Sequence, residues 1–280
     1  MNISHRMLHM PSFEQIPPLS ELTDEVIHIA ARAAERILTV YNSSFSVVQK
    51  DDESPLTEAD MASHHCICDY LNRLTPDIPV FTEESSSVSF DTRKSWTYYW
   101  LIDPLDGTRE FIKQNGEFTV NIALIHDHQP VIGVINVPVT GRTYYASQGN
   151  GAFIKVPGEP ARQIQTRQTR KEAIKVAGSR SHGSKKLRAF IEKLGDVELL
   201  SIGSSLKFCL VAEGMVDIYP RFGPTSEWDT AAAQCIVEEA GGAVMDMSMN
   251  RLTYNMKAEL LNPQFIAIAD PSFDWSPYLR

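Results

Sequence analysis

The chain has 280 residues, and its 26 lysines and arginines against 35 aspartates and glutamates give a formal net charge of −9. This acidic balance disfavours binding along a nucleic-acid polymer, because such binding needs clustered positive charge to release counterions. The chain is 43% hydrophobic and 22% charged, ordinary proportions for a globular protein, which excludes a disordered chain. A chain of this length forms one large domain or two modest ones and needs no disulfide bonds.

The cysteines and the N-terminal residues bear on the compartment. The cysteines are Cys66, Cys68, Cys209 and Cys235, and their spacing fits neither paired zinc ligands nor a redox CxxC. Free thiols in a reducing cytoplasm are therefore expected. Residues 1–18 end in two prolines and lack a continuous apolar stretch, which predicts a flexible tail and no secretory signal. No apolar run approaches the roughly 18 residues that span a bilayer, so no transmembrane segment is predicted.

Two helices are predicted after the tail. From Ser20 to Tyr41, apolar residues recur at helical spacing while charged residues fall off that stripe. A second helix is predicted from Thr57 to Leu74, with the Thr57 hydroxyl as a candidate N-cap and Pro76 just beyond the helix end.

The next part of the chain has the pattern of a β-sheet. Short apolar runs follow one another at small intervals and are separated by Gly, Pro and Asn. Close spacing without intervening helices predicts an antiparallel meander. The predicted strands cover residues 78–81, 98–102, 118–125, 131–137, 143–146 and 152–156.

Beyond Arg170, strands and helices alternate, which predicts a layered α/β arrangement. The polar stretch 156–170 is the predicted boundary between the two halves. We therefore predict an N-terminal α+β subdomain over 19–160 and a C-terminal α/β subdomain over 161–280. The predicted strands of the second half cover residues 173–177, 197–202, 216–219, 243–247 and 265–269, and its helices cover 185–194, 204–213 and 228–239.

The segment from Asp103 to Thr108 follows an apolar strand and reads Asp-Pro-Leu-Asp-Gly-Thr. Its two carboxylates can converge on one hard cation such as Mg²⁺, and the Leu105 carbonyl points into the same space. Pro104 keeps Asp103 extended, and Gly107 lets the backbone turn sharply. An acidic turn at the end of a strand is the alternative that this fragment alone leaves open.

Further carboxylates stand beside apolar elements. Thr82-Glu83-Glu84-Ser85 ends an apolar strand, and Asp229 stands at the start of an apolar helix. By itself, Asp229 is more simply explained as a cap of the helix amides. These blocks, the Asp103-to-Thr108 motif and the Glu-Ala-Gly-Gly run at 239–242 occur together and in the order typical of one family. From about Leu19 to its end, the chain resembles the inositol monophosphatase superfamily of metal-dependent, lithium-sensitive phosphatases.

The resemblance implies a fold of the α/β class, a layered α/β/α/β/α sandwich, and a site for two or three Mg²⁺ ions. One ion, with Glu83 and the Thr108 hydroxyl backed by Asp60, would activate a water, and another would stabilise the leaving oxygen. The amides of Gly107 and Thr108 would hold the phosphate. The implied metal ligands are Glu83, Asp103, the Leu105 carbonyl, Asp106 and Asp229, and all of them but Asp103 are also implied substrate contacts.

The second half is similar to the CysQ type of this superfamily, the bacterial 3′(2′),5′-bisphosphate nucleotidases. Gly203-Ser204-Ser205-Leu206-Lys207 and Tyr219-Pro220-Arg221 carry this likeness. A nucleoside bisphosphate has a second phosphate that needs cations other than the metals, and Lys207 and Arg221 can supply them. The alternatives are a solvated helix residue for Lys207 and an exposed strand end for Arg221. The resemblance adds His182 and Ser204 as nucleotide contacts.

The implied activity is Mg²⁺-dependent hydrolysis of adenosine 3′,5′-bisphosphate to AMP and phosphate, with 3′-phosphoadenylyl sulfate as a further candidate substrate. Such an activity removes a by-product of sulfate assimilation. The alternatives are a phosphatase for inositol or fructose phosphates and an inactive metal- and phosphate-binding regulatory protein. The implied location is the cytoplasm or the cytoplasmic face of the inner membrane. The residues leave open the oligomeric state and the number of ions used in turnover.

Overall fold

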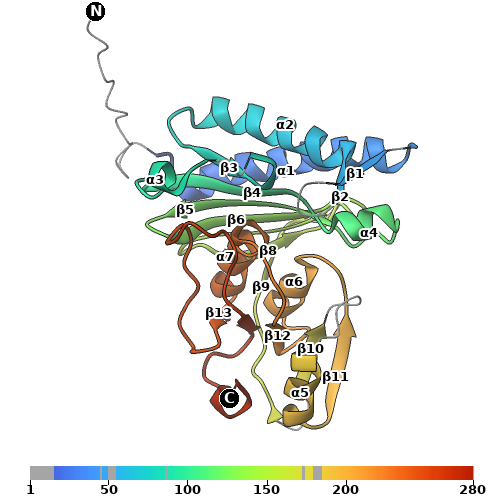
Figure 1. The fold of residues 1–280 in the computed structure, drawn as a ribbon, viewed down its shortest axis with the longest axis vertical. Helices are drawn as coiled ribbons and strands as arrows, with labels where there is room; N and C mark the ends of the chain where they lie inside the picture. Colours follow the sequence, from blue (N-terminus) through green and yellow to red (C-terminus); the bar gives the residue numbers. More distant parts are fainter. Residues whose placement is uncertain are drawn as a thin grey trace, which may run out of the picture.

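The structure, a computed structural model, describes residues 16–44, 46–49, 55–85, 88–171, 174–178 and 185–279. Of the predicted tail, residues 1–15 lie outside this part. The chain forms stacked layers of helices and sheets, with a pair of long helices above a large sheet and a smaller sheet beneath it (Figure 1). Each sheet is covered on both faces, which is what an α/β layering requires.

The first layer consists of α1 (Leu19–Tyr41) and α2 (Glu58–Leu74). Their apolar faces share one core with the strands below them. The Thr57 side chain accepts a hydrogen bond from the Ala59 amide, so it caps α2 as its position predicted. Both predicted helices are therefore confirmed, with α1 beginning one residue earlier than expected.

A seven-stranded sheet forms the second layer, in the order β3-β4-β5-β6-β7-β8-β9. All neighbours are antiparallel except β3 and β4, so the predicted meander is confirmed from β4 onward. The short β9 was not predicted, because it lies in the polar stretch that we assigned to the boundary. The strands are β3 (Val80–Thr82), β4 (Tyr98–Asp106), β5 (Thr119–His126), β6 (Gln129–Val137), β7 (Arg142–Ser147), β8 (Gly151–Lys155) and β9 (Arg162–Ile164).

The middle layer consists of α6 (Leu206–Ala212) and α7 (Ala231–Glu239). Both helices pack into the core between the two sheets. Helix α7 lies directly on β6, because Gly133 has no side chain: a Cβ at this position would lie 2.2 Å from the Ala232 carbonyl oxygen. This close approach holds the N-terminal end of α7 against the large sheet.

A five-stranded sheet follows, in the order β11-β10-β12-β14-β13, with α5 (Lys185–Leu194) and α8 (Ser276–Leu279) packed in the outermost core. The α/β/α/β/α sandwich that the resemblance implied is thereby confirmed. The first sheet ends at Ile164 and the second begins at Ile174, while the division into subdomains at 160/161 stays a prediction. The strands are β10 (Ile174–Gly178), β11 (Val197–Ser201), β12 (Ile218–Arg221), β13 (Ala243–Asp246) and β14 (Phe265–Ile268).

Several short elements lie at the ends of the strands. They are the hairpin of β1 (Val47–Gln49) and β2 (Pro55–Thr57), the 3₁₀ turns η2 (Glu83–Ser85) and η4 (Glu227–Asp229), and the helices α3 (Phe90–Arg93) and α4 (Thr108–Ile112). None of the helices within the described ranges combines the length and the apolar character needed to cross a membrane.

Candidate active site

The site begins at the end of β4, where Asp103 and Asp106 are three residues apart. In a regular strand, residues three apart face opposite sides of the sheet. Here Asp103 lies opposite Asn121 and Asp106 opposite Thr119, so three steps along β4 match two along β5. This bulge compensates for the odd spacing and brings both carboxylates to one side. The predicted strand ends at Ile102, four residues too early, because the apolar run that predicted it ends there.

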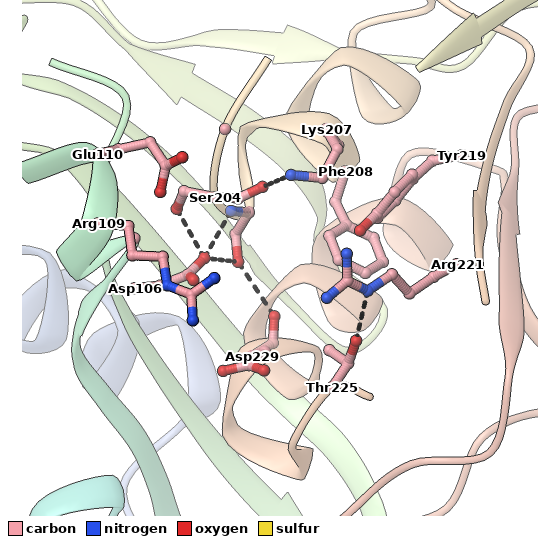
Figure 2. Close-up of a pocket in the computed structure, with 13 residues that line it drawn as sticks. Asp106, Arg109, Glu110, Ser204, Lys207, Phe208, Tyr219, Arg221, Thr225 and Asp229 are labelled. Carbon is pink, nitrogen blue, oxygen red and sulfur yellow. Dashed lines mark hydrogen bonds between the residues drawn. The ribbon is translucent and has the colours of Figure 1, made fainter. Parts of the chain in front are cut away.

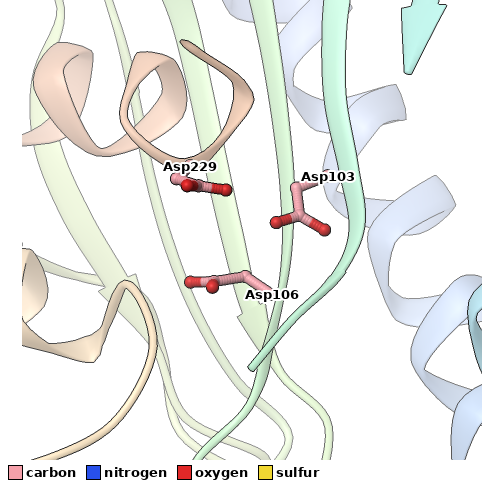
Figure 3. Close-up of side chains that lie close together, drawn as sticks. All are labelled: Asp103, Asp106 and Asp229. Carbon is pink, nitrogen blue, oxygen red and sulfur yellow. The ribbon is translucent and has the colours of Figure 1, made fainter. Parts of the chain in front are cut away.

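Asp229 approaches the same point from the opposite half of the chain. It lies in η4, just before α7, and its Oδ2 accepts a hydrogen bond from the Ser226 amide at 2.8 Å. The expected capping role is thus found at η4, where Asp229 and Ser226 form a capping box, whereas α7 follows Thr230 without a side-chain cap. Figure 3 shows the side chains of Asp103, Asp106 and Asp229 close together, and one carboxylate oxygen of each lies within 4.8 Å of the others.

The three carboxylates repel one another in a buried setting. Burial, and then the negative charges of Glu83 and Asp106, raise the pKa of Asp103, which is 1% exposed. Burial raises the pKa of Asp229 as well, followed by the charges of Asp106 and Glu83. Glu83 in η2 is thus close enough to act on the cluster, although it is not part of it. Oxygen ligands whose charge is uncompensated fit a hard divalent cation such as Mg²⁺.

Asp60 and Thr108 meet beside the cluster. The Thr108 hydroxyl donates to Asp60 Oδ1 at 3.3 Å, and the Thr57 amide and hydroxyl donate to Asp60 Oδ2 at 2.8 and 2.6 Å. Thr108 Oγ1 also lies 3.4 Å from the Leu105 carbonyl oxygen. The capping box of α2 therefore holds the acid that orients Thr108.

Gly107 makes the turn from β4 into α4. Its φ of +93° lies in the left-handed region, which favours glycine. Space is also short, because a Cβ would lie 3.1 Å from the Glu117 carbonyl oxygen and 3.2 Å from Ser204 Cβ. Gly107 thus brings the start of α4 close to the segment that carries Ser204.

Asp106 is held by two consecutive serines that precede α6. The Ser204 hydroxyl donates to Asp106 Oδ2 at 2.6 Å, and the Ser205 amide and hydroxyl donate to the same oxygen at 2.6 and 2.8 Å. Sequence reasoning gave Ser204 a nucleotide contact and overlooked Ser205. The sequence did hold a signal for these contacts, because Thr119 and Asn121 are polar residues in an apolar strand. The hydroxyls of Thr119 and Ser204 form a hydrogen bond at 2.7 Å, and the side-chain amide of Asn121 donates to Ser205 Oγ at 3.0 Å.

A pocket of about 130 Å³ opens beside the cluster (Figure 2). Asp106 and Asp229 line one side, and cationic and aromatic side chains from α6 and β12 line the other. Sequence reasoning gave Phe208 and Tyr219 no role in the site because their helix and strand positions are typical of a core. The lining residues to which it assigned no role are Arg109, Glu110, Gly203, Ser205, Phe208, Tyr219 and Thr225.

Lys207 lines the pocket but is only 5% exposed. Its ammonium donates to the carbonyl oxygens of Ser204 and Ile202 at 2.6 and 3.3 Å. Burial lowers its pKa to about 8. The alternative of a solvated helix residue is therefore wrong. Lys207 supports the backbone that holds Asp106, and its predicted contact with substrate stays a prediction.

Arg221 ends β12 at the other side of the pocket. Its Nε donates to Thr225 Oγ1 at 2.7 Å and its Nη2 to the Pro224 carbonyl oxygen at 3.0 Å. In the part of the chain that the structure covers, no carboxylate contacts this guanidinium. Its charge is thus available to a ligand in the pocket. His182 lies outside the described residues.

A buried polar network lies behind the cluster. Arg93 donates to the Asn255 side chain and to the carbonyl oxygens of Lys257 and Ala258. The backbone N–H of Asn255 donates to both carboxylate oxygens of Glu227, which lies two residues before Asp229. This network fastens the segment 255–258 to η4. No local pattern could have predicted it, because Arg93 and Asn255 are 162 residues apart.

Comparisons with known proteins point to one family. The model of the inositol monophosphatase family matches residues 18–269. The 3′(2′),5′-bisphosphate nucleotidase CysQ of Escherichia coli (strain K12) is 46% identical over 246 residues, which cover 87% of this chain and 98% of that protein. The CysQ of Aggregatibacter actinomycetemcomitans is 39% identical over 257 residues, 91% and 96% of the two chains.

Solved structures show the same likeness. The crystal structure of CysQ from Bacteroides thetaiotaomicron, described as a bacterial member of the inositol monophosphatase family, superposes with a TM-score of 0.80 at 41% identity. The match covers 90% of this chain and 98% of that one. An inositol monophosphatase from Zymomonas mobilis reaches a TM-score of 0.74 at 25% identity, over 94% and 98% of the chains. The protein described here belongs to the inositol monophosphatase family.

Proposed function

We propose that this protein is a Mg²⁺-dependent 3′(2′),5′-bisphosphate nucleotidase that hydrolyses adenosine 3′,5′-bisphosphate to AMP and phosphate. Relatives at 38–46% identity carry the name of that activity. The observation that carries the proposal is one pocket whose walls are acidic at Asp106 and Asp229 and cationic at Arg221 (Figure 2). A substrate with two phosphates suits such a pocket, because one phosphate meets metal ions and the other meets the guanidinium.

The acidic side is the proposed metal site. Its ligands would be Asp103, Asp106, Asp229, Glu83 and the Leu105 carbonyl, for two or three Mg²⁺ ions. Burial and the mutual repulsion of the carboxylates, which together raise the pKa of both Asp103 and Asp229, support this assignment. Bound Mg²⁺ would supply the positive charge that neutralises a phosphate and the acidity that activates a water.

The protein's own groups orient the attacking water in this proposal. The Thr108 hydroxyl donates its hydrogen bond to Asp60, so its oxygen lone pairs can accept a hydrogen bond from the water. Glu83 provides a second acceptor on the acidic side. The amides of Gly107 and Thr108 would hold the scissile phosphate at the start of α4.

The cationic side would bind the phosphate that is not cleaved. Arg221 presents a guanidinium whose planar fork matches two phosphate oxygens. Lys207 has a third N–H beyond the two that its carbonyl partners use, and this N–H would reach the same anion. Ser204 and His182 complete the proposed nucleotide contacts, His182 on the resemblance alone.

We propose a cytoplasmic location. All four cysteines are free thiols in the structure, which is typical of a reducing compartment. The proposed partner is a small phosphorylated nucleotide.

The test is phosphate release with Mg²⁺ from a panel of adenosine 3′,5′-bisphosphate, 3′-phosphoadenylyl sulfate, inositol 1-phosphate and fructose 1,6-bisphosphate. We expect the largest kcat/KM with adenosine 3′,5′-bisphosphate and loss of turnover when EDTA removes the metal. Faster hydrolysis of an inositol or fructose phosphate would replace the proposal with that activity. No turnover of any compound would support a regulatory protein instead.

A further inference from the structure

Tyr219 lies on β12, and neither its place in the strand nor its burial explains why this residue carries a hydroxyl group. It is only 4% exposed, and its ring packs edge-to-face on Phe208 with centroids 5.0 Å apart. A buried tyrosine usually gives its hydroxyl a hydrogen-bond partner. Within the described ranges, however, the Tyr219 hydroxyl makes no hydrogen bond, unlike the hydroxyls of Tyr144 and Tyr254.

The unpaired hydroxyl faces the pocket. Tyr219 lines the pocket, and Figure 2 shows its oxygen directed toward the middle of it, beside the guanidinium of Arg221. The two side chains are two positions apart on β12, so they extend from the same face of the strand. The charges of Arg221, Asp106 and Asp229 act on the phenol, so the guanidinium and the acidic cluster both lie near it.

The groups around this hydroxyl select an anion. The Arg221 guanidinium and the Lys207 ammonium, whose nitrogen lies 5.3 Å from the centre of the Tyr219 ring, are donors only. Burial raises the pKa of Tyr219 well above its ordinary value, so the phenol keeps its proton and is a donor too. Converging donors suit a phosphate, whose oxygens are hydrogen-bond acceptors.

We propose that Tyr219 is a specificity residue whose hydroxyl donates a hydrogen bond to the phosphate that is not cleaved. The inference rests on the proposed function, because it takes a nucleoside bisphosphate as the substrate. It adds a neutral donor to the cations already assigned to that phosphate. It also explains why a tyrosine stands at a position where phenylalanine would fill the core equally well.

The test removes one atom. Tyr219→Phe keeps the ring and its packing on Phe208 and deletes only the hydroxyl. Tyr99→Phe is the matched control, because the Tyr99 hydroxyl is also buried without a hydrogen bond but lies outside the pocket. Both variants and the wild type are assayed with Mg²⁺ on adenosine 3′,5′-bisphosphate and on adenosine 3′-phosphate. The two substrates share the scissile ester and differ only in the 5′-phosphate.

We expect Tyr219→Phe to lower kcat/KM on adenosine 3′,5′-bisphosphate about 10- to 100-fold, the range for a hydrogen bond to a charged group. On adenosine 3′-phosphate it should change kcat/KM less than about twofold, and Tyr99→Phe should leave both substrates within this range. Equal losses on both substrates, or no loss on either, would overturn the role of Tyr219. A wild-type protein that does not hydrolyse adenosine 3′,5′-bisphosphate would overturn the proposed function and this inference together.

Discussion

At the scale of single residues, Asp103 is the carboxylate whose surroundings fit a metal ligand best. It is 1% exposed, and other acids of the cluster surround it. Its Oδ1 accepts a hydrogen bond from the Leu105 amide at 3.0 Å, which fixes the side chain in the bulge of β4. A buried carboxylate in such surroundings is costly unless a cation or a proton compensates its charge. This cost supports the metal-binding role proposed for Asp103.

Asp103→Asn should lower kcat at saturating Mg²⁺ by at least about 100-fold, because it weakens a ligand of the proposed metal site. The variant should still fold: without Mg²⁺ it should melt no lower than the wild type, since one repelling charge is removed. Steady-state kinetics and thermal unfolding in EDTA check both statements. Asp91→Asn, at an exposed surface carboxylate, is the control. Turnover near the wild-type rate would remove Asp103 from the mechanism.

The two cations of the pocket should behave differently from each other. Arg221 has no carboxylate partner in the described part of the chain, so Arg221→Ala should lower kcat/KM on adenosine 3′,5′-bisphosphate by one to two decades. Adenosine 3′-phosphate, which lacks the second phosphate, should be affected little. Lys207 supports the backbone of Ser204, whose hydroxyl holds Asp106. Lys207→Ala should therefore reduce hydrolysis of both compounds, and it should reduce that of adenosine 3′,5′-bisphosphate more, because the proposed contact of Lys207 with the second phosphate is lost as well.

The ratio of the two losses is the informative quantity, measured on the same preparations of each variant. Arg162→Ala, at an exposed arginine that pairs with Glu213, serves as the control for loss of a positive charge. Equal losses for Arg221→Ala on both substrates would assign Arg221 a general electrostatic role. No loss on either would place its contacts outside the site.

At the scale of elements, η4 is positioned by the buried network of Arg93, Asn255 and Glu227. Arg93→Ala would leave the Asn255 side chain and two backbone carbonyls without their donor. We expect the free energy of unfolding to fall by about 3 kcal/mol or more, as for other buried charged groups that lose their partner. Urea denaturation measures this value. Arg93→Lys keeps the charge and should recover part of the loss, whereas an unchanged unfolding midpoint in Arg93→Ala would contradict the role of the network.

Elements whose pattern is local could be predicted from the sequence. Helices α1 and α2 have apolar residues at helical spacing, and the Thr57 cap has a defined position. The short β9 and the 3₁₀ turn that carries Asp229 could not be predicted, because tertiary contacts rather than propensity determine them. The residues of the site divide in the same way into those that a local sequence pattern predicts and those that only the fold reveals. The carboxylates occur in recognisable blocks, whereas Tyr219 and Arg93 look like core and surface residues until the fold brings their partners together.

At the scale of the whole molecule, the site lies where the two halves of the chain meet. Asp103 and Asp106 come from the large sheet and Asp229 from the turn before α7, so cations bound there link both halves. Mg²⁺ that binds only the folded state should raise the melting temperature with its concentration. Lithium should inhibit in competition with Mg²⁺, because it is similar in size but carries half the charge.

Both effects are measured on one preparation, by thermal unfolding over a Mg²⁺ series and by activity at several Li⁺ and Mg²⁺ concentrations. Lithium inhibition that excess Mg²⁺ does not relieve would contradict a shared site. Insensitivity to Li⁺ at tens of millimolar would also count against a shared site. This dose is of the order of several times a weak metal-site Kd.

The proposed function requires the pocket to select a nucleoside bisphosphate over other phosphate esters. The most direct measurement is a competition in one reaction, in which equimolar adenosine 3′,5′-bisphosphate and inositol 1-phosphate are hydrolysed with Mg²⁺ and the initial product ratio gives the ratio of kcat/KM. Two donor contacts to the second phosphate, from Arg221 and Tyr219, predict an excess of AMP of at least about 100-fold. A ratio near one, or inositol as the first product, would contradict the claim.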